Sequence, residues 1–165
     1  MNNYENYKKY IKYARRCIWI LTIVYMGIIF FLSSRSIDQS REDSARLMAA
    51  IGIVDSVEDA TDVDNSYMMR LQTTVRKHAH FIIFGGLGVL IFLSIYGYAG
   101  NAFPTAIKAW ALTTFYGATD EFHQIFSNRG ASIDDVILNS LGAATTIAIV
   151  FVVFFVLEKK GVIYK

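Results

Sequence analysis

Three long runs of this sequence contain no charged residue, and they decide the solvent in which the chain folds. Residues 136–157 form the clearest run, with 22 residues free of Asp, Glu, Lys and Arg. Residues 17–34 and 81–99 are uncharged in the same way. Because a helix needs about 20 apolar residues to cross the ~30 Å hydrocarbon core of a bilayer, each run is predicted to be a membrane-spanning helix.

A fourth span is predicted over residues 103–122, although this segment is less apolar than the other three. Lys108 lies near its start, and Thr113 and Asp120 interrupt it. A lysine near a helix end reaches the headgroup region with its ammonium group, and a helix enclosed by partners tolerates polar side chains. The predicted fold is therefore an all-α bundle of four transmembrane helices, formed by a single domain over residues 1–165.

The distribution of basic residues predicts the orientation of this bundle. Five lysines and arginines precede the first span, against one acid, and such an excess marks the cytoplasmic side. Four spans then return the C-terminus to the cytoplasm as well. Residues 35–77 become the longest outer loop, in which apolar residues at helical spacing predict two short amphipathic helices on the membrane, over residues 40–54 and 66–80.

Composition argues against several classes of protein. Hydrophobic residues make up 54% of the chain and charged residues only 18%, against about 25% charged in an average soluble protein, so a typical water-soluble enzyme is disfavoured. The net charge of +2 leaves no basic face of the kind that nucleic acid needs. The single cysteine, Cys17, cannot form an internal disulfide.

Ionisable residues gather at the ends of the predicted spans, where charge next to hydrocarbon is costly and marks either function or pairing. One group enters the second span, another leaves the third, and the last leads into the fourth. The predicted topology puts all three groups at the outer face. Their members are Arg76, Lys77, His78 and His80; Asp120, Glu121, His123 and Gln124; and Arg129, Ser132, Asp134, Asp135 and Asn139.

Helical spacing sorts these groups, since residues three or four apart share a face of a helix. Lys77 aligns with His80 on the second span, and Asp135 aligns with Asn139 on the fourth. Ser132 and Asp134 are secondary members. The predicted binding site consists of Lys77, His80, Asp120, Glu121, Gln124, Arg129, Asp135 and Asn139.

The third span carries the largest set of titratable groups. Asp120, His123 and Gln124 line one side of it, and Glu121 lies about a quarter turn away. Imidazole and carboxyl groups are the usual partners in proton transfer. The candidates for a catalytic role are therefore His80, Glu121 and His123, with His123 a secondary member of the site.

The polar residues described above belong to short motifs that follow one another along the chain, and through these motifs the sequence resembles the VanZ-like family of bacterial membrane proteins. The resemblance covers most of the chain and departs from many members at Ser127-Asn128, where they have a Pro-Gly turn. It implies a four-span protein of the bacterial cell membrane, with a role in lowering susceptibility to glycopeptide antibiotics such as teicoplanin, and it supplies no mechanism. The matching segments are Phe31–Ser34, Lys77–Phe81 (K-x-x-H-F), Asp120–Phe126 (D-E-x-H-Q-x-F), Arg129–Val136 (R-x-x-S-x-x-D-V) and Asn139–Gly142 (N-x-x-G).

Two interpretations of the polar site involve no chemical reaction. In the first, Lys77, His80 and Arg129 form a cationic pocket for an anionic headgroup, because arginine and lysine bind phosphate and carboxylate oxygens. The ligand would be a membrane lipid, a lipid-linked cell-wall precursor or a lipoglycopeptide antibiotic. In the second, the same residues are structural and pair between helix ends.

A third interpretation is enzymatic. Here His80 or His123 acts as a general base beside Asp120 or Glu121, in hydrolysis or transfer at a lipid-linked substrate. A metal site built from His78 or His80, His123 and one carboxylate is a variant of it. We assign no cofactor and no nucleic-acid partner, and the oligomeric state stays open. A transporter is disfavoured because the polar residues cluster at one end of the spans.

Overall fold

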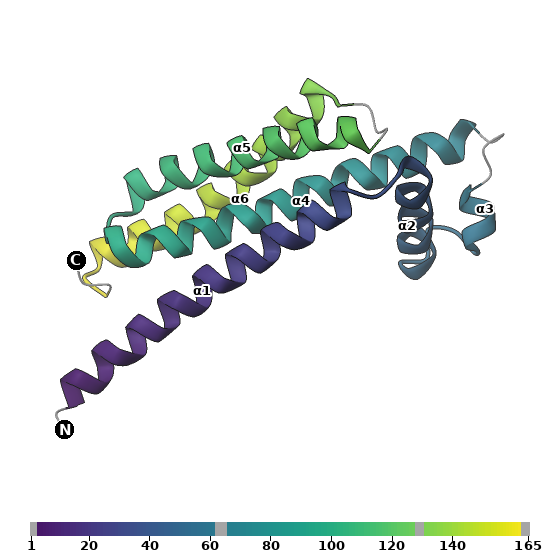
Figure 1. Cartoon of the computed structure of the whole chain (residues 1–165). Coiled ribbons are helices and arrows are strands. Elements are labelled where there is room, and N and C mark those ends of the chain that lie inside the picture. The colour runs from purple at the N-terminus through teal and green to yellow at the C-terminus, as the bar shows by residue number, and fades with distance from the viewer. Residues whose placement is uncertain (1–2, 62–65, 128–130, 163–165) are drawn as a thin grey trace.

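The computed structural model describes residues 3–61, 66–127 and 131–162, and within these ranges every regular element is a helix. The predicted all-α class is confirmed. The helices are α1 (Asn3–Ser33), α2 (Ile37–Ala50), α3 (Val57–Thr61), α4 (Ser66–Ala99), α5 (Ala102–Phe126) and α6 (Ile133–Lys159) (Figure 1).

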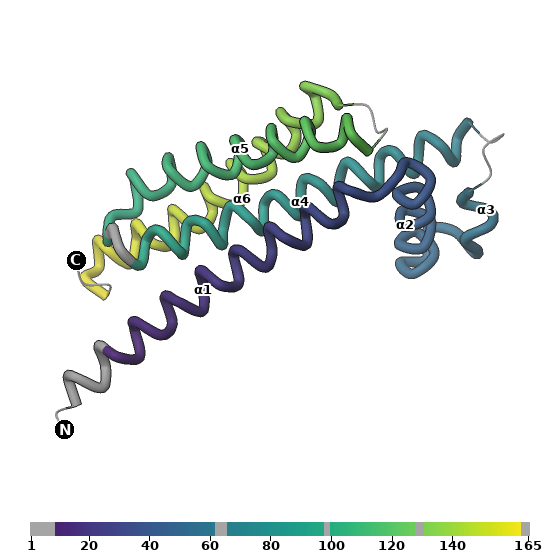
Figure 2. The backbone as a smooth tube through the Cα atoms, viewed as in Figure 1, coloured from purple at the N-terminus to yellow at the C-terminus, as the bar shows by residue number. Residues whose placement is uncertain are grey.

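Four long helices, α1, α4, α5 and α6, form a bundle in which the chain direction alternates (Figure 1). The central helix is α4, which packs against each of the other three. The beginning of α1 and the end of α6 lie at the same end of the bundle. The short helices α2 and α3 lie at the opposite end, with α2 crosswise to the long helices (Figure 2).

In the part of the chain that the structure describes, three helices are long and apolar enough to cross a membrane, namely Lys9–Ser33, Ser66–Gly97 and Ile133–Lys159. They correspond to the first, second and fourth predicted spans. The third predicted span, residues 103–122, lies within α5, which is not one of the three. Lysine, threonine and acidic side chains lower the hydropathy of α5. The structure thus contains three helices of membrane-spanning length and apolarity, and a more polar fourth helix packed against them.

The segment between the first two spans differs from its prediction. The first expected amphipathic helix is present as α2, which begins earlier than predicted because Ser36 caps it and accepts a hydrogen bond from the Gln39 backbone nitrogen. The second, residues 66–80, is not a separate helix. It contains neither proline nor glycine to interrupt it, and it forms the first part of α4.

The apolar side of α2 is covered by protein. Ala45 and Met48 of α2 and Ala60 of α3 are fully buried together, with Leu71 and Val75 of α4 packed against them. These residues therefore do not face outward, as a helix lying on the membrane would require. Instead, α2 and α3 form a small second core on the part of α4 that extends beyond the bundle.

At the opposite end of the bundle, Glu158 of α6 joins three helices. Its Oε1 atom accepts hydrogen bonds from Tyr96 Oη of α4 and from the Ala102 backbone nitrogen of α5, both at 2.9 Å. The carboxylate also lies at the positive N-terminus of α5, where a negative charge is stabilising. This side chain fixes where α4 ends and α5 begins.

The Glu158→Ala variant is expected to lower the free energy of unfolding by about 1–3 kcal/mol, because it leaves two donors without their acceptor. Chemical unfolding of the purified protein in detergent micelles measures this change. Lys160→Ala, which alters an exposed side chain two residues away, is the control and should leave the stability unchanged. Equal stability of the two variants would show that Glu158 does not hold the helix ends.

Candidate functional site

The polar groups of α4, α5 and α6 converge at the end of the bundle where α1 and α5 end and α6 begins (Figure 1). Each helix presents them at a spacing of three or four residues, so that they line one face. The glycine and amide residues one turn deeper keep the three helices close. The groups that meet are Lys77 and His80 of α4, Asp120, Glu121 and Gln124 of α5, and Asp135 of α6.

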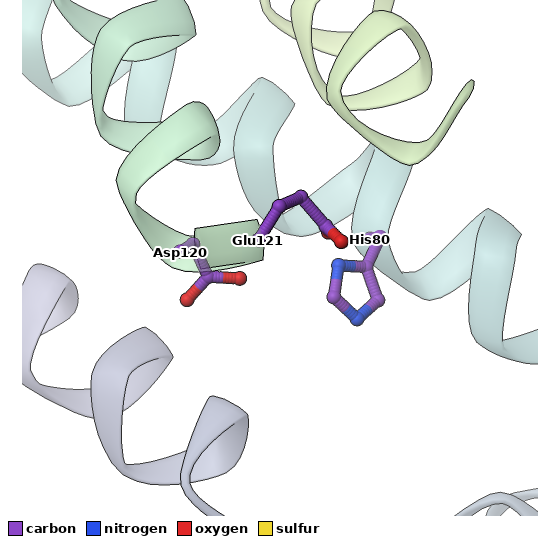
Figure 3. Close-up of side chains that lie close together, drawn as sticks. All are labelled: His80, Asp120 and Glu121. Atoms are coloured by element: carbon purple, nitrogen blue, oxygen red, sulfur yellow. The ribbon is translucent and has the colours of Figure 1, made fainter. Parts of the chain in front are cut away.

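The centre of this cluster is formed by one imidazole and two carboxyl groups. His80, Asp120 and Glu121 each place one polar atom within 4.8 Å of those of the other two. The two carboxyl side chains enter from neighbouring positions of α5, and the Glu121 side chain extends toward the imidazole on α4 (Figure 3). Asp120 is only 4% exposed and Glu121 only 3%. Titratable groups that are this close and this buried make the cluster a candidate functional site.

Gln124 holds the two carboxyl groups in place. Its Nε2 atom donates to Asp120 Oδ2 and to Glu121 Oε1, both at 3.1 Å. Because Gln124 is three and four residues beyond its partners, one turn of α5 is enough to form both bonds. The amide therefore fixes the orientation of the two acids from within their own helix.

An ion pair lies at the outer edge of the cluster. Lys77 Nζ is 3.5 Å from Asp135 Oδ1, and the two side chains are 46% and 27% exposed. An ion pair that is this accessible to solvent contributes about 0–1 kcal/mol to stability. Its main effect is to join α4 to the first turn of α6 beside the buried groups.

A deeper layer of the site separates it from the apolar core. Phe84 and Asn139 follow His80 and Asp135 by four residues, and both lie against Gly117, which precedes Glu121 by four. The Asn139 side chain is buried, and within the described ranges its amide has no hydrogen-bond partner. Asn139 is thus part of the predicted stripe on α6 but lies one turn below the cluster.

Two cavities of different character meet at His80. The first, of about 60 Å³, is lined by the polar groups Lys77, Glu121, Gln124 and Asp135 together with Arg76 and His80. The second, of about 220 Å³, lies between α1, α2 and α4, and most of its surface is apolar. Arg76 and His80 line both cavities. The polar cavity and the apolar cavity therefore share a wall formed by the guanidinium of Arg76 and the imidazole of His80.

Other predicted site residues lie elsewhere. His123 does not join Asp120 and Gln124 as predicted, because its ring packs on Phe30 of α1 with ring centroids 4.3 Å apart. It lines neither cavity, and Glu121 takes the expected position beside Asp120. Arg129 lies outside the described residues.

The remaining polar residues near the site have local roles. Ser132 caps α6 and accepts a hydrogen bond from the Asp134 backbone nitrogen at 3.2 Å, while the Asp134 side chain is exposed. His78 is also exposed, and its Nδ1 atom lies 2.8 Å from the Thr74 carbonyl oxygen of the preceding turn. The fold therefore does not bring together the metal ligands considered from sequence, in which His78 or His80 was combined with His123.

The sequence places Arg76 among the groups that enter the second span, but the predicted site omits it and does not include the wall formed by α2. Arg76 precedes His80 by four residues, so helical spacing alone could have placed it on the same face. The contribution of α2 had no such signal, because it depends on how the segment after α1 folds back. Arg35 fixes that segment through an ion pair of 2.7 Å from its Nε to Asp43 Oδ2, and the second cavity is lined by Ser40, Asp43, Ser44 and Leu47 of α2.

Comparison with known families gives one match. The family model described as VanZ/LLP1 matches residues 18–155. This range includes all of Ser66–Gly97, residues 18–33 of the first apolar helix, residues 133–155 of the last, and every residue of the polar cluster. Neither the curated proteins nor the solved structures contain a match to the chain.

Proposed function

The chain belongs to the VanZ/LLP1 family, and from this membership and the geometry of its site we propose that it binds an amphiphile of the cell envelope. The anionic headgroup lies in the polar cavity, and the first part of the apolar chain lies in the neighbouring cavity. The observation that carries this proposal is the shared wall, because Arg76 and His80 line a polar and an apolar chamber at once.

The sizes of the cavities fit part of a lipid. Small-molecule pockets usually measure about 300–1,000 Å³, and the apolar cavity of about 220 Å³ is smaller than this. It accommodates a segment of a hydrocarbon chain, whose remainder extends between the helices into the bilayer. The α2 helix covers this cavity, and the packing of Ala45 and Met48 against Leu71 and Val75 of α4 holds it there.

The headgroup chemistry follows from the cations of the polar cavity. The guanidinium of Arg76 provides forked donors for phosphate oxygens, and the ammonium of Lys77 adds a point charge. The acids of the cavity favour a headgroup that also carries donors or is bound together with a cation. A polyprenyl phosphate or another lipid-linked cell-wall precursor has this chemistry. If the protein and a teicoplanin-type antibiotic bind the same lipid, their competition for it would connect the site to resistance.

In this proposal α5 also crosses the membrane, as a fourth span. Its polar residues Thr105, Thr113 and Glu121 are buried against the neighbouring helices, whereas large apolar residues such as Phe115 are exposed. Trp110 Nε1 also donates to Ser140 Oγ of α6 at 3.0 Å. A helix with its polar side enclosed and its apolar side outward suits lipid. With the N-terminus in the cytoplasm, as the basic residues predict, the site opens at the outer face.

Lipid retention tests this function directly. Protein reconstituted in phosphatidylcholine vesicles with a small fraction of a polyprenyl phosphate is extracted and analysed by native mass spectrometry. Wild type should retain the polyprenyl phosphate in preference to phosphatidylcholine. Arg76→Gln should reduce retention about tenfold or more, because a hydrogen bond to a charged group contributes about 1.5–3 kcal/mol and 1.4 kcal/mol is a factor of ten.

The matched control is Lys108→Gln, which removes an exposed cation at the other end of α5 and should leave retention unchanged. Loss of retention in both variants would indicate attraction to charge in general. No preference by the wild type would contradict the proposed function and leave the polar groups a structural role, whereas release of free phosphate from the lipid would indicate the enzymatic alternative.

A further inference from the structure

The buried groups at the centre of the site have the composition of a metal centre. His80 offers an imidazole nitrogen, and Asp120 and Glu121 each offer a carboxylate oxygen. One nitrogen and two oxygen ligands suit zinc and manganese, which bind imidazole and carboxylate together. Two carboxylates would also balance the charge of one divalent cation, which reduces the large cost of burying charge away from water.

The distances fit such an ion with small side-chain adjustments. Zinc binds nitrogen and oxygen ligands at about 2.0–2.2 Å in a tetrahedral arrangement, so any two of its ligand atoms lie about 3.3–3.6 Å apart. The three ligand atoms lie within 4.8 Å of one another. The separations therefore have to shrink by at most about 1.5 Å for all three atoms to reach bonding distance.

The surroundings also have the features of a metal site. Gln124 donates to both acids, and groups of this kind outside the ligand set orient carboxylates toward a metal. Three protein ligands leave further coordination positions for water or a substrate. Both cavities reach the ligand set, because His80 and Glu121 line the polar cavity while His80 and Asp120 line the apolar one, so water or a substrate would have access to the ion.

We propose that His80, Asp120 and Glu121 bind one divalent transition-metal ion, zinc or manganese, between the two cavities. This site differs from the metal variant considered from sequence, since it takes both acids of α5 and neither His78 nor His123. It does not depend on the identity of the lipid. An ion in this position would add a positive charge at the inner wall of the polar cavity, next to Arg76.

Metal binding by the full-length protein tests the proposal. Protein purified in detergent is stripped with a chelator and titrated separately with Zn²⁺, Mn²⁺ and Mg²⁺. Bound metal is counted by mass spectrometry, and binding of Co²⁺ is followed by its visible absorption. Wild type should bind about one zinc or manganese ion per chain and should unfold at a higher temperature with the metal. Asp120→Asn and Glu121→Gln, which keep the size of each side chain, should each weaken binding at least tenfold.

The controls are His78→Asn and Asp134→Asn, since both residues are exposed and titratable but lie outside the cluster. They should bind metal as wild type does. Absence of stoichiometric metal in wild type, or equal binding by all four variants, would overturn the proposal. If the amide variants fail to fold, the Co²⁺ spectrum of wild type still decides, because a spectrum without imidazole ligation contradicts the site. Lipid retention measured with and without chelator separates failure of this site from failure of the lipid function.

Discussion

Replacing Gly142 by alanine is expected to lower the free energy of unfolding by about 2–3 kcal/mol, the upper part of the range for overpacked sites. A Cβ atom at this position would overlap the carbonyl oxygen of Phe81 in α4. Backbone cannot rotate away as a side chain can, so α4 and α6 would have to move apart. The hydrogen bond from Thr146 Oγ1 to the Gly85 carbonyl oxygen, 2.8 Å long, would be stretched by the same movement.

Chemical unfolding of the purified variant in micelles, together with its amount in the membrane, measures this effect. The control is Gly27→Ala in α1, where a Cβ would meet no atom within 4 Å and helix propensity favours alanine. The two variants make the same chemical change in two helices of the same bundle. Similar stability for both would mean that α4 and α6 do not approach as closely as described.

Filling the apolar cavity is expected to remove lipid binding without touching the polar cluster. Ala79 lines this cavity, and the Ala79→Phe variant places a ring in a space of about 220 Å³, so the bundle itself need not expand. Two methylene groups excluded from the cavity account for about 1.6 kcal/mol, or slightly more than a tenfold loss of affinity. Retention of a long-chain polyprenyl phosphate should fall by this factor, whereas binding of a short, water-soluble allylic phosphate should not change.

The same variant tests whether the apolar cavity is needed for resistance to teicoplanin. In a sensitive bacterial host, wild type should raise resistance to teicoplanin, and Ala79→Phe at the same membrane level should not. Ala118→Phe, which makes the same change at an exposed position of α5, is the control and should protect as wild type does. Adding a glycopeptide without a lipid tail shows whether protection depends on the tail. Full protection by Ala79→Phe would separate the cavity from resistance.

The convergence of the polar groups was predictable because two simple rules act together. Spacing of three or four residues selects a face of each helix, and the alternating direction of the spans brings the end of one to the start of the next. These rules placed His80, Glu121 and Asp135 at one end of the bundle. They need no knowledge of how the helices are rotated against one another.

Rotation was the part that the sequence left undetermined. Helix α5 contacts α1 as well as α4 and α6, so polar residues on more than one side of it can be covered. Spacing placed His123 on the side of Asp120 and Gln124, but its ring faces Phe30 of α1, and Glu121, a quarter turn away by spacing, lines the polar cavity. The position of α2 over the apolar cavity depends on contacts between distant segments, such as Met48 of α2 with Leu71 and Val75 of α4, and no local pattern predicts these.

The unbroken length of α4 has a mechanical consequence. Its 34 residues span about 51 Å at 1.5 Å per residue, well beyond the ~30 Å of hydrocarbon. The end that carries Arg76 and His80 packs against α2, α3, α5 and α6, and the other end meets Glu158 of α6 through Tyr96. Because one stiff helix joins the two ends, a tilt imposed on either of them is transmitted to the other.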